Sequence, residues 1–386
     1  MCLFKRLMIA GFCLCMTVHC MAQANSAKPI RVAVFAPVYL DSVFADDVYK
    51  PGKNSLPRYI LPGLDFYNGV MLAVDSLNAE KVSVEVLFFD SKSSSIQDLT
   101  DAQSLQDVSL IIASFNTRAE IRPLADLALE KNIPLISSTY PNDGGITANP
   151  FFVMLNPTIT AHIEAIYKYV HRIYPTENIT LFHKKGNAED MIQSVLNDMN
   201  KRTPGIPLKL KTVELADSFS VKDITDQLDS TKQNIIICGT LNESFGIDLS
   251  KALASVKNYR PVLIGMPTWD GLKDISKDIE TVYSTPYNLT RTDKASLSII
   301  EKYRTKYAGR PGDMVFKGFE SMYHFTKLLL KYNNDVTAHL SDKEYKLFND
   351  FDFQPVKNKE SGATDYLENK KLYFIRKQNG ILKPAN

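Results

Sequence analysis

The sequence predicts an α/β fold of two lobes, each built around a doubly wound, largely parallel sheet. Two observations support this prediction. From Ile30 onward, short β-branched runs alternate with segments whose apolar residues recur at helical spacing, which is the pattern of βαβ units. After Asn156-Pro157, where no regular element continues, the same alternation begins again. A second sheet explains this better than one oversized sheet.

The first lobe is expected to begin with a strand at Ile30–Ala36, followed by a long loop. A helix is expected over residues 65–78, where Phe66, Val70 and Leu77 belong to one apolar stripe. Val82 and the alternating residues after it predict the next strand. The strands expected after the first are residues 82–90, 109–113, 133–138 and 151–155, with a helix over 121–128.

The second lobe repeats these elements, and the chain then continues into two more helices and an alternating tail. Its strands are expected at residues 178–183, 209–213, 233–238, 262–264 and 281–283. The later helices are expected near residues 293–307 and 314–332. The tail from Phe348 alternates apolar and polar residues and predicts antiparallel strands around a turn at Gln378-Asn379-Gly380.

The N-terminus has the pattern of an export signal. Lys5 and Arg6 precede a short apolar run over residues 7–18, and Ala22-Gln23-Ala24 is a small-x-small cleavage site. No cysteine near that site follows a small residue, so a lipid anchor is not expected. We expect a signal peptide at residues 1–24 and a periplasmic or otherwise extracytoplasmic mature protein.

Charge and cysteine content exclude several classes of function. The chain has 45 basic and 43 acidic residues, and two of the basic residues lie in the signal peptide, so the mature chain has no formal net charge. Nucleic acid is therefore not an expected partner. Only Cys238 remains after cleavage, within an apolar run typical of a buried strand. No second apolar run is long enough to span a membrane.

Common catalytic and cofactor motifs are absent from the sequence. It contains no phosphate-binding glycine loop, no His-Glu-x-x-His and no Gly-x-Ser-x-Gly. None of the five histidines of the mature chain has a second His or a Cys at metal-ligand spacing. We therefore expect no enzymatic activity, no catalytic residue, no metal and no cofactor.

Polar residues at the carboxyl ends of the predicted strands form the candidate site, because open α/β sheets bind ligands at that edge. Hydroxyl and amide side chains there suit a small zwitterion or a sugar. The alternative is that these side chains cap the helices that follow. The candidates are Ser114, Asn116, Ser137, Ser138 and Thr139 in the first lobe, and Thr240, Asn242, Trp269 and Asp270 in the second.

The order of several motifs resembles the type I periplasmic-binding-protein superfamily, which includes branched-chain amino-acid binding proteins of ABC importers. The resemblance covers nearly all of the mature chain. Its helix Phe66-Tyr-Asn-Gly-Val-Met-Leu-Ala-Val-Asp-Ser-Leu77 is most similar to a Bacteroidetes branch often attached to LysM modules. The motifs are Ile30–Ala36 with Pro37, residues 66–77, 121–128 and 132–138, 303–311 and 318–321.

The resemblance implies two Rossmann-like lobes joined by a three-strand hinge and closing on a small molecule. It implies that Ser114 and residues 137–139 bind the carboxylate and amine of an amino acid, and that Thr240, Asn242 and Asp270 contact it from the second lobe. The lobes would be discontinuous, with the first at residues 25–155 and 287–346 and the second at 156–286 and 347–386. One departure is the long connection over residues 39–64.

The sequence thus predicts a solute-binding protein that captures an amino-acid-like ligand, for ABC-type uptake or sensing, with an ABC permease or another envelope protein as partner. The alternative is a cell-envelope scaffold or regulator that uses the same fold to dock a protein or a peptidoglycan-linked partner through residues 39–64 or the C-terminal strands.

Overall fold

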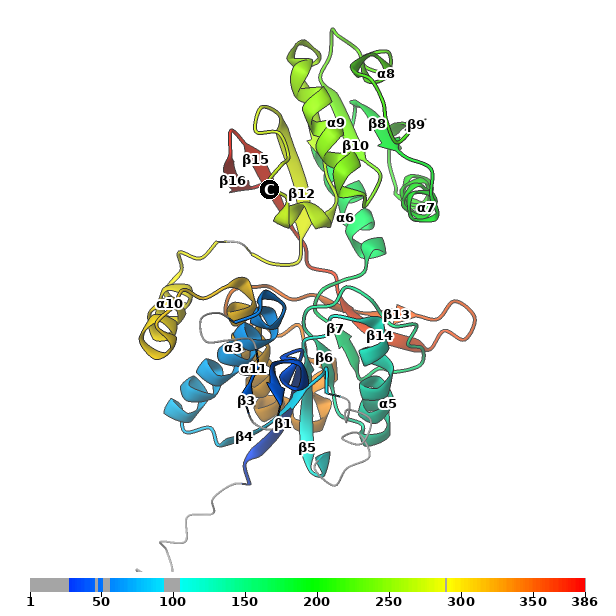
Figure 1. Cartoon of the computed structure of the whole chain (residues 1–386). Helices are drawn as coiled ribbons and strands as arrows, with labels where there is room; N and C mark the ends of the chain where they lie inside the picture. Colours follow the sequence, from blue (N-terminus) through cyan, green and yellow to red (C-terminus); the bar gives the residue numbers. More distant parts are fainter. Residues whose placement is uncertain (1–27, 46–47, 51–55, 94–104, 289, 386) are drawn as a thin grey trace, which may run out of the picture.

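Two lobes, each with a seven-stranded sheet, make up the computed structural model (Figure 1). It describes residues 28–45, 48–50, 56–93, 105–288 and 290–385, and the expected signal peptide lies outside them. Within these ranges, no helix combines the length and the apolar character needed to cross a lipid bilayer.

The first lobe has the strand order β13-β14-β7-β6-β5-β1-β4, and its central strands are parallel. Helices α3, α10 and α11 pack on one face of the sheet and α5 packs on the other. The strands are β1 (Ile30–Ala36), β4 (Val84–Asp90), β5 (Val108–Ala113), β6 (Leu135–Ser137), β7 (Phe152–Met154), β13 (Phe353–Lys357) and β14 (Thr364–Asn369). The helices are α3 (Leu61–Ala79), α5 (Ile121–Lys131), α10 (Lys294–Tyr307) and α11 (Asp313–Tyr332).

The second lobe has the order β16-β15-β12-β11-β10-β8-β9, with β8 to β12 parallel and β15 and β16 added antiparallel. Its strands are β8 (Asn178–His183), β9 (Lys209–Glu214), β10 (Asn234–Cys238), β11 (Pro261–Ile264), β12 (Glu280–Thr285), β15 (Tyr373–Gln378) and β16 (Ile381–Pro384). Its helices are α6 (Ile159–Ile173), α7 (Asn187–Arg202), α8 (Val221–Thr225) and α9 (Glu243–Ser255).

The remaining elements are short. In the long connection after β1 they are α2 (Leu40–Val43), β2 (Phe44–Ala45), β3 (Val48–Tyr49) and the 3-10 helix η1 (Arg58–Ile60). The other 3-10 helices are η3 (Arg118–Glu120), η4 (Lys257–Tyr259), η5 (Pro267–Gly271) and η6 (Asn333–Ala338).

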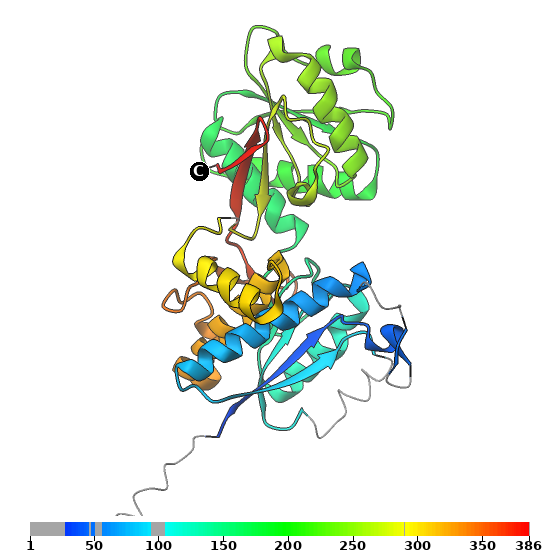
Figure 2. The same cartoon turned by 60° about the vertical axis from the view of Figure 1, so that its left-hand side comes forward.

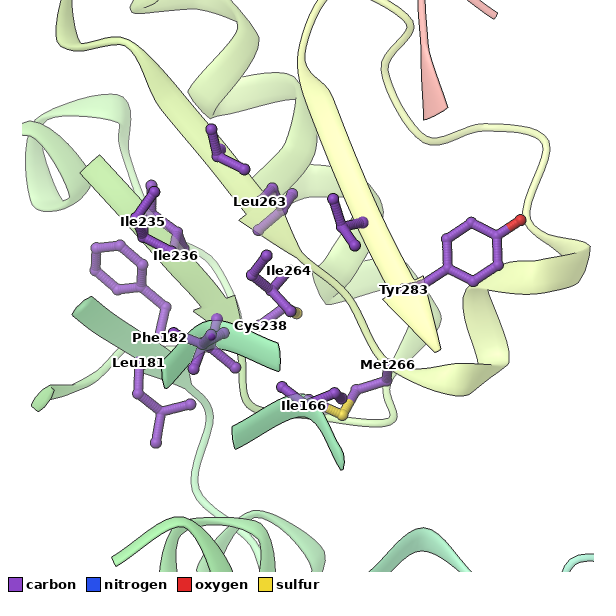
Figure 3. Close-up of a cluster of buried hydrophobic side chains, with 14 of the residues drawn as sticks. Ile166, Leu181, Phe182, Ile235, Ile236, Cys238, Leu263, Ile264, Met266 and Tyr283 are labelled. Carbon is purple, nitrogen blue, oxygen red and sulfur yellow. The ribbon is translucent and has the colours of Figure 1, made fainter. Parts of the chain in front are cut away.

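The core of the second lobe explains why its strands could be recognised in the sequence. A parallel strand covered on both faces has no polar face, so its residues form a continuous apolar run. Ile235, Ile236 and Leu263 are fully buried in this core (Figure 3). Cys238 is also fully buried, and its burial raises the pKa of the thiol to about 12, which confirms it as a core residue.

The chain crosses between the lobes three times. It passes upward in Figure 1 between β7 and α6, returns between β12 and α10, and passes upward again between β14 and β15. α6 and β12, which adjoin the first two crossings in the second lobe, contact each other, because the ring nitrogen Nδ1 of His162 lies 2.9 Å from Oγ of Ser284. Each lobe is therefore assembled from separate parts of the chain.

The expected assignment of residues 347–386 to the second lobe is wrong for their first half. β13 and β14 belong to the first sheet, because Leu367 and Glu368 pair in parallel with Val153 and Met154 at the edge that β7 would otherwise leave open. β15 and β16 do join the second sheet. Their hairpin turns at Asn379 and Gly380, with φ values of 51° and 75°, as the Asn-Gly pair predicted.

Helices α3 and α11 approach each other so closely that glycine is required at their crossing. A Cβ atom on Gly69 would overlap the carbonyl oxygen of Val315, and one on Gly318 would overlap that of Phe66. This pair of backbone contacts sets the position of α11, whose first turns lie beside the second connection between the lobes.

Replacing Gly69 by Ala should lower the free energy of unfolding by about 1 to 3 kcal/mol, because the added methyl group forces the two helices apart. The matched control is Gly271→Ala, since a Cβ atom at Gly271 meets no atom within 4 Å. Urea unfolding of both variants measures the difference. Equal stability of the two variants would contradict the close helix contact.

Candidate functional site

The carboxyl ends of the parallel strands in each lobe point toward the other lobe. This follows from the connections, because the chain leaves the first lobe directly after β7 and the second directly after β12 (Figures 1 and 2). The strand order reverses between β1 and β5 in the first sheet and between β8 and β10 in the second. Ligands of open α/β sheets bind at such points. Ser114 directly follows β5, and Thr240 lies two residues after β10.

Two of the predicted first-lobe residues come together. Oγ of Ser114 lies 3.3 Å from Oγ1 of Thr139, and Thr139 donates to the carbonyl of Phe115 at 2.9 Å. Ser114 is buried, whereas Thr139 is partly exposed. Asn116 is exposed and donates from Nδ2 to the hydroxyl of Tyr39 at 2.9 Å, which ties the long connection to this edge.

Ser137 and Ser138 lie deeper, at the base of the same edge. Both side chains are buried, and the hydroxyl of Ser138 accepts a hydrogen bond from Ser321 of α11 at 3.0 Å. The carbonyl of Ser138 accepts from the hydroxyl of Tyr287 at 3.1 Å. Ser137 Oγ has no hydrogen-bond partner among the described residues. Thr139 and Asn116 are therefore more accessible to a ligand than Ser137 and Ser138.

In the second lobe, Thr240 and Asn242 have structural partners. The buried Thr240 hydroxyl donates to Oε1 of Glu189 at 2.5 Å and accepts from the backbone N–H of Asn242 at 3.0 Å. The side chain of Asn242 accepts from the backbone N–H of Phe245 at 2.9 Å, so it caps α9. The hydroxyl of Thr240 therefore already has two partners within the protein, while Asn242 is an exposed residue.

Trp269 packs in the second lobe and Asp270 faces outward. Trp269 is 3% exposed, and a Cβ atom on Gly246 or Gly265 would overlap its indole ring. Asp270 is exposed at the carboxyl edge, 3.5 Å from the hydroxyl of Tyr283, which points out of the apolar cluster in Figure 3. Surrounding protein atoms, and then the negative charge of Asp313, raise the pKa of Asp270.

Two residues that the sequence analysis did not select complete this region. Tyr287 lies on the second connection, and the ammonium group of Lys317 lies 3.8 Å from the centre of its ring. Lys317 is half-buried on α11, between the apolar residues Phe316 and Phe319. A single lysine within an apolar helical stretch was the signal that could have identified it.

A buried carboxylate on α11 is hydrogen-bonded to the segment that contacts the second connection between the lobes. Glu320 on α11 accepts hydrogen bonds from the backbone N–H groups of Phe348 and Asn349 at 3.0 and 2.9 Å, and from the side-chain amide of Asn349. The side-chain oxygen of Asn349 in turn accepts from the backbone N–H of Asn288 at 2.7 Å. Burial raises the pKa of Glu320 to about 7.

Solved structures with the same architecture include substrate-binding proteins. A Desulfitobacterium hafniense ABC transporter substrate-binding protein in complex with Leu matches with a TM-score of 0.60 and 14% identity, over 93% of this chain and all of that chain. A branched-chain amino-acid ABC transporter ligand-binding protein from Burkholderia xenovorans gives 0.61 and 13%, over 92% and 94%. The chain has the type I periplasmic-binding-protein fold.

A third protein with the type I periplasmic-binding-protein fold, an ABC transporter substrate-binding protein from Sphaerobacter thermophilus, matches with a TM-score of 0.57 and 14% identity, over 93% of this chain and 96% of that one. No protein-family model and no curated protein matches the chain. The predicted fold class is confirmed.

A groove of about 530 Å³ also opens between the lobes of this periplasmic-binding-protein fold. Residues from both lobes line it, among them Asp143 and Tyr366 from the first and Glu164 and Arg202 from the second. None of the nine predicted site residues lines it. In the described ranges, no three His, Cys, Asp or Glu side chains are grouped as a metal site.

Glu320→Gln should reduce the pH dependence of stability. The pKa of Glu320 rises from an ordinary value of 4.5 to about 7 on folding, so below pH 4.5 the group is protonated in both states. As pH rises from 4.5 to 7, the unfolded chain releases this proton first, and the free energy of unfolding falls by about 3 kcal/mol. Glutamine has no such proton.

Urea unfolding of the wild type and the variant at pH 5 and pH 8 tests this. The wild type should lose more stability than the variant between the two pH values. An equal loss in both proteins would show that the Glu320 carboxyl does not change its pKa on folding.

Proposed function

We propose that this protein is an extracytoplasmic solute-binding protein that captures a small polar, amino-acid-like ligand between its lobes, without catalysis. The observation that carries the proposal is the placement of both strand-order reversals on edges that face each other. The similar structures of ABC transporter proteins, one of them in complex with Leu, support this and favour ABC-type uptake or sensing.

Binding would act through a change in the angle between the lobes. Thr139 and Asn116 offer polar groups on the first lobe, and Asp270 offers a carboxylate on the second. A ligand that contacts both sets at once stabilises the closed arrangement by its difference in affinity for the two states. The three connections between the lobes are the segments that must bend.

A thermal-shift screen of residues 25–386 tests the proposal. Amino acids, short peptides, sugars and peptidoglycan fragments are the compounds to screen, since a ligand that binds only the folded state raises the melting temperature. Trp269 is the only tryptophan of the chain and adjoins Asp270, so its fluorescence reports on the same region. At least one compound should raise the melting temperature, and none doing so would contradict solute binding.

Thr139→Val should weaken the affinity for the compound that the screen identifies by about tenfold, because the variant keeps the shape of the side chain and loses one hydrogen bond. Thr225→Val is the matched control, since Thr225 likewise donates to a carbonyl, that of Lys222, on α8. Isothermal titration calorimetry gives both dissociation constants. An unchanged constant for Thr139→Val would place the ligand elsewhere.

A docking function is the second candidate, and exposed apolar side chains favour it. Large apolar residues between positions 40 and 61 are exposed, including Val48 at 67% and Tyr59 at 50%. A scaffold would give an empty ligand screen. In cells, a photoreactive residue at Val48 would crosslink to an envelope protein, while one at the exposed Leu297 of α10 would not.

A further inference from the structure

Another groove, of about 550 Å³, lies at the junction of the two lobes. Helix α6 and strands β15 and β16 contribute its lining from the second lobe, and residues 370–372 of the third crossing continue it toward the first lobe. Figure 2 shows α6 and β15 side by side above the third crossing. The lining includes none of the predicted site residues, so the groove is separate from the candidate site at the strand ends.

The charged side chains that line the groove are mostly cationic. Lys168 and Arg172 lie four residues apart on one face of α6, and Lys371 lies on the third crossing. Among the described residues, none of these three side chains has a carboxylate within 4.0 Å or a hydrogen-bond partner. Asp350 acts on Lys371 from beyond that distance, and it pairs with Lys346 at 2.7 Å.

The carboxylates at the groove do not balance these three cations. Lys370, a fourth cation of the lining, forms an ion pair with the buried Glu368. Asp352 is the one acidic side chain among the described residues that line the groove. Three cations therefore face one carboxylate. Like charges four residues apart, as in the pair on α6, destabilise a helix unless an anion lies beside them.

Aromatic rings position two of the cations. The guanidinium carbon of Arg172 lies 5.9 Å from the centre of the Tyr169 ring, and the ammonium group of Lys371 lies 5.5 Å from that of Tyr373. Tyr169 is buried and stacks on Phe374 with 4.3 Å between ring centres. A ring face attracts a cation without supplying a negative charge. The cations are thus held in place but not neutralised.

We propose that this groove binds a phosphate group, carried either by a small molecule or by a lipid headgroup. A phosphate monoester has a charge of about −1.5 to −2 at pH 7 and three acceptor oxygens, so it balances the excess of cations better than one carboxylate does. Arginine binds phosphate through two parallel hydrogen bonds, and lysine adds a point charge. The inference does not depend on the proposed function, because the ligand contacts proposed there involve other residues.

The test is isothermal titration calorimetry of residues 25–386 in Tris buffer with inorganic phosphate, with glycerol 3-phosphate, and with glycerol as the matched compound without phosphate. Cosedimentation with phosphatidylcholine vesicles, prepared with and without phosphatidic acid, tests the lipid source. Binding of a soluble phosphate but not of glycerol would support a small-molecule ligand. Binding only to vesicles that contain phosphatidic acid would support a lipid headgroup, and binding to neither would overturn the proposal.

A double variant tests the residues. Lys168→Gln combined with Arg172→Gln should weaken phosphate binding at least about tenfold, because two of the three unneutralised cations are lost. Lys209→Gln combined with Lys211→Gln is the matched control, since it removes two exposed lysines of β9 in the same lobe and changes the net charge equally. The control should change the affinity less than about twofold.

Three results would overturn the role of these cations. One is equal affinity of the wild type and the groove variant. Another is an equal loss in both double variants, which would show attraction by net charge alone. The last concerns stability, since the groove variant should melt at or above the temperature of the wild type without phosphate, because the repulsion along α6 is relieved. A lower melting temperature with unchanged affinity would show that the cations serve the fold.

Discussion

The three crossings of the chain between its two sheets are the constraint on which the rest of the structure depends. They place α10, α11 and the β13–β14 pair in the first lobe and β15–β16 in the second, so neither lobe is a continuous stretch of sequence. They also make the carboxyl edges of the sheets face each other. Hydrogen bonds anchor the second crossing to the first lobe, from Tyr287 to Ser138 and from Asn288 to Asn349. These two bonds hold the start of the second crossing against the first lobe.

The fold could be predicted where local sequence determines it. Central parallel strands are buried on both faces, and the expected bounds of β1 and β8 agree with the structure. The assignment of β13 and β14 failed because their place is set by pairing with β7, about two hundred residues earlier in the chain, and no local pattern encodes that partner. The β15–β16 hairpin was predictable, because Asn379-Gly380 specifies its turn locally.

The candidate site could be predicted only to the level of the sheet edge. The sequence places hydroxyl and amide residues after the strands, but it does not show which are already occupied. The hydroxyl of Thr240 is hydrogen-bonded to Glu189, and the indole ring of Trp269 packs against two glycines; neither contact could be foreseen from the sequence. The contact of Lys317 with Tyr287 could not be predicted, because it forms only when the second crossing brings the two residues together.

Closure of the lobes around a ligand is the central claim, and small-angle X-ray scattering measures it most directly. The radius of gyration of residues 25–386 should be determined alone and with a saturating concentration of the compound that most raises the melting temperature. Closure predicts a smaller radius of gyration with the compound, because the two lobes approach each other. An unchanged radius at saturation would contradict a clamp mechanism, even if the compound binds.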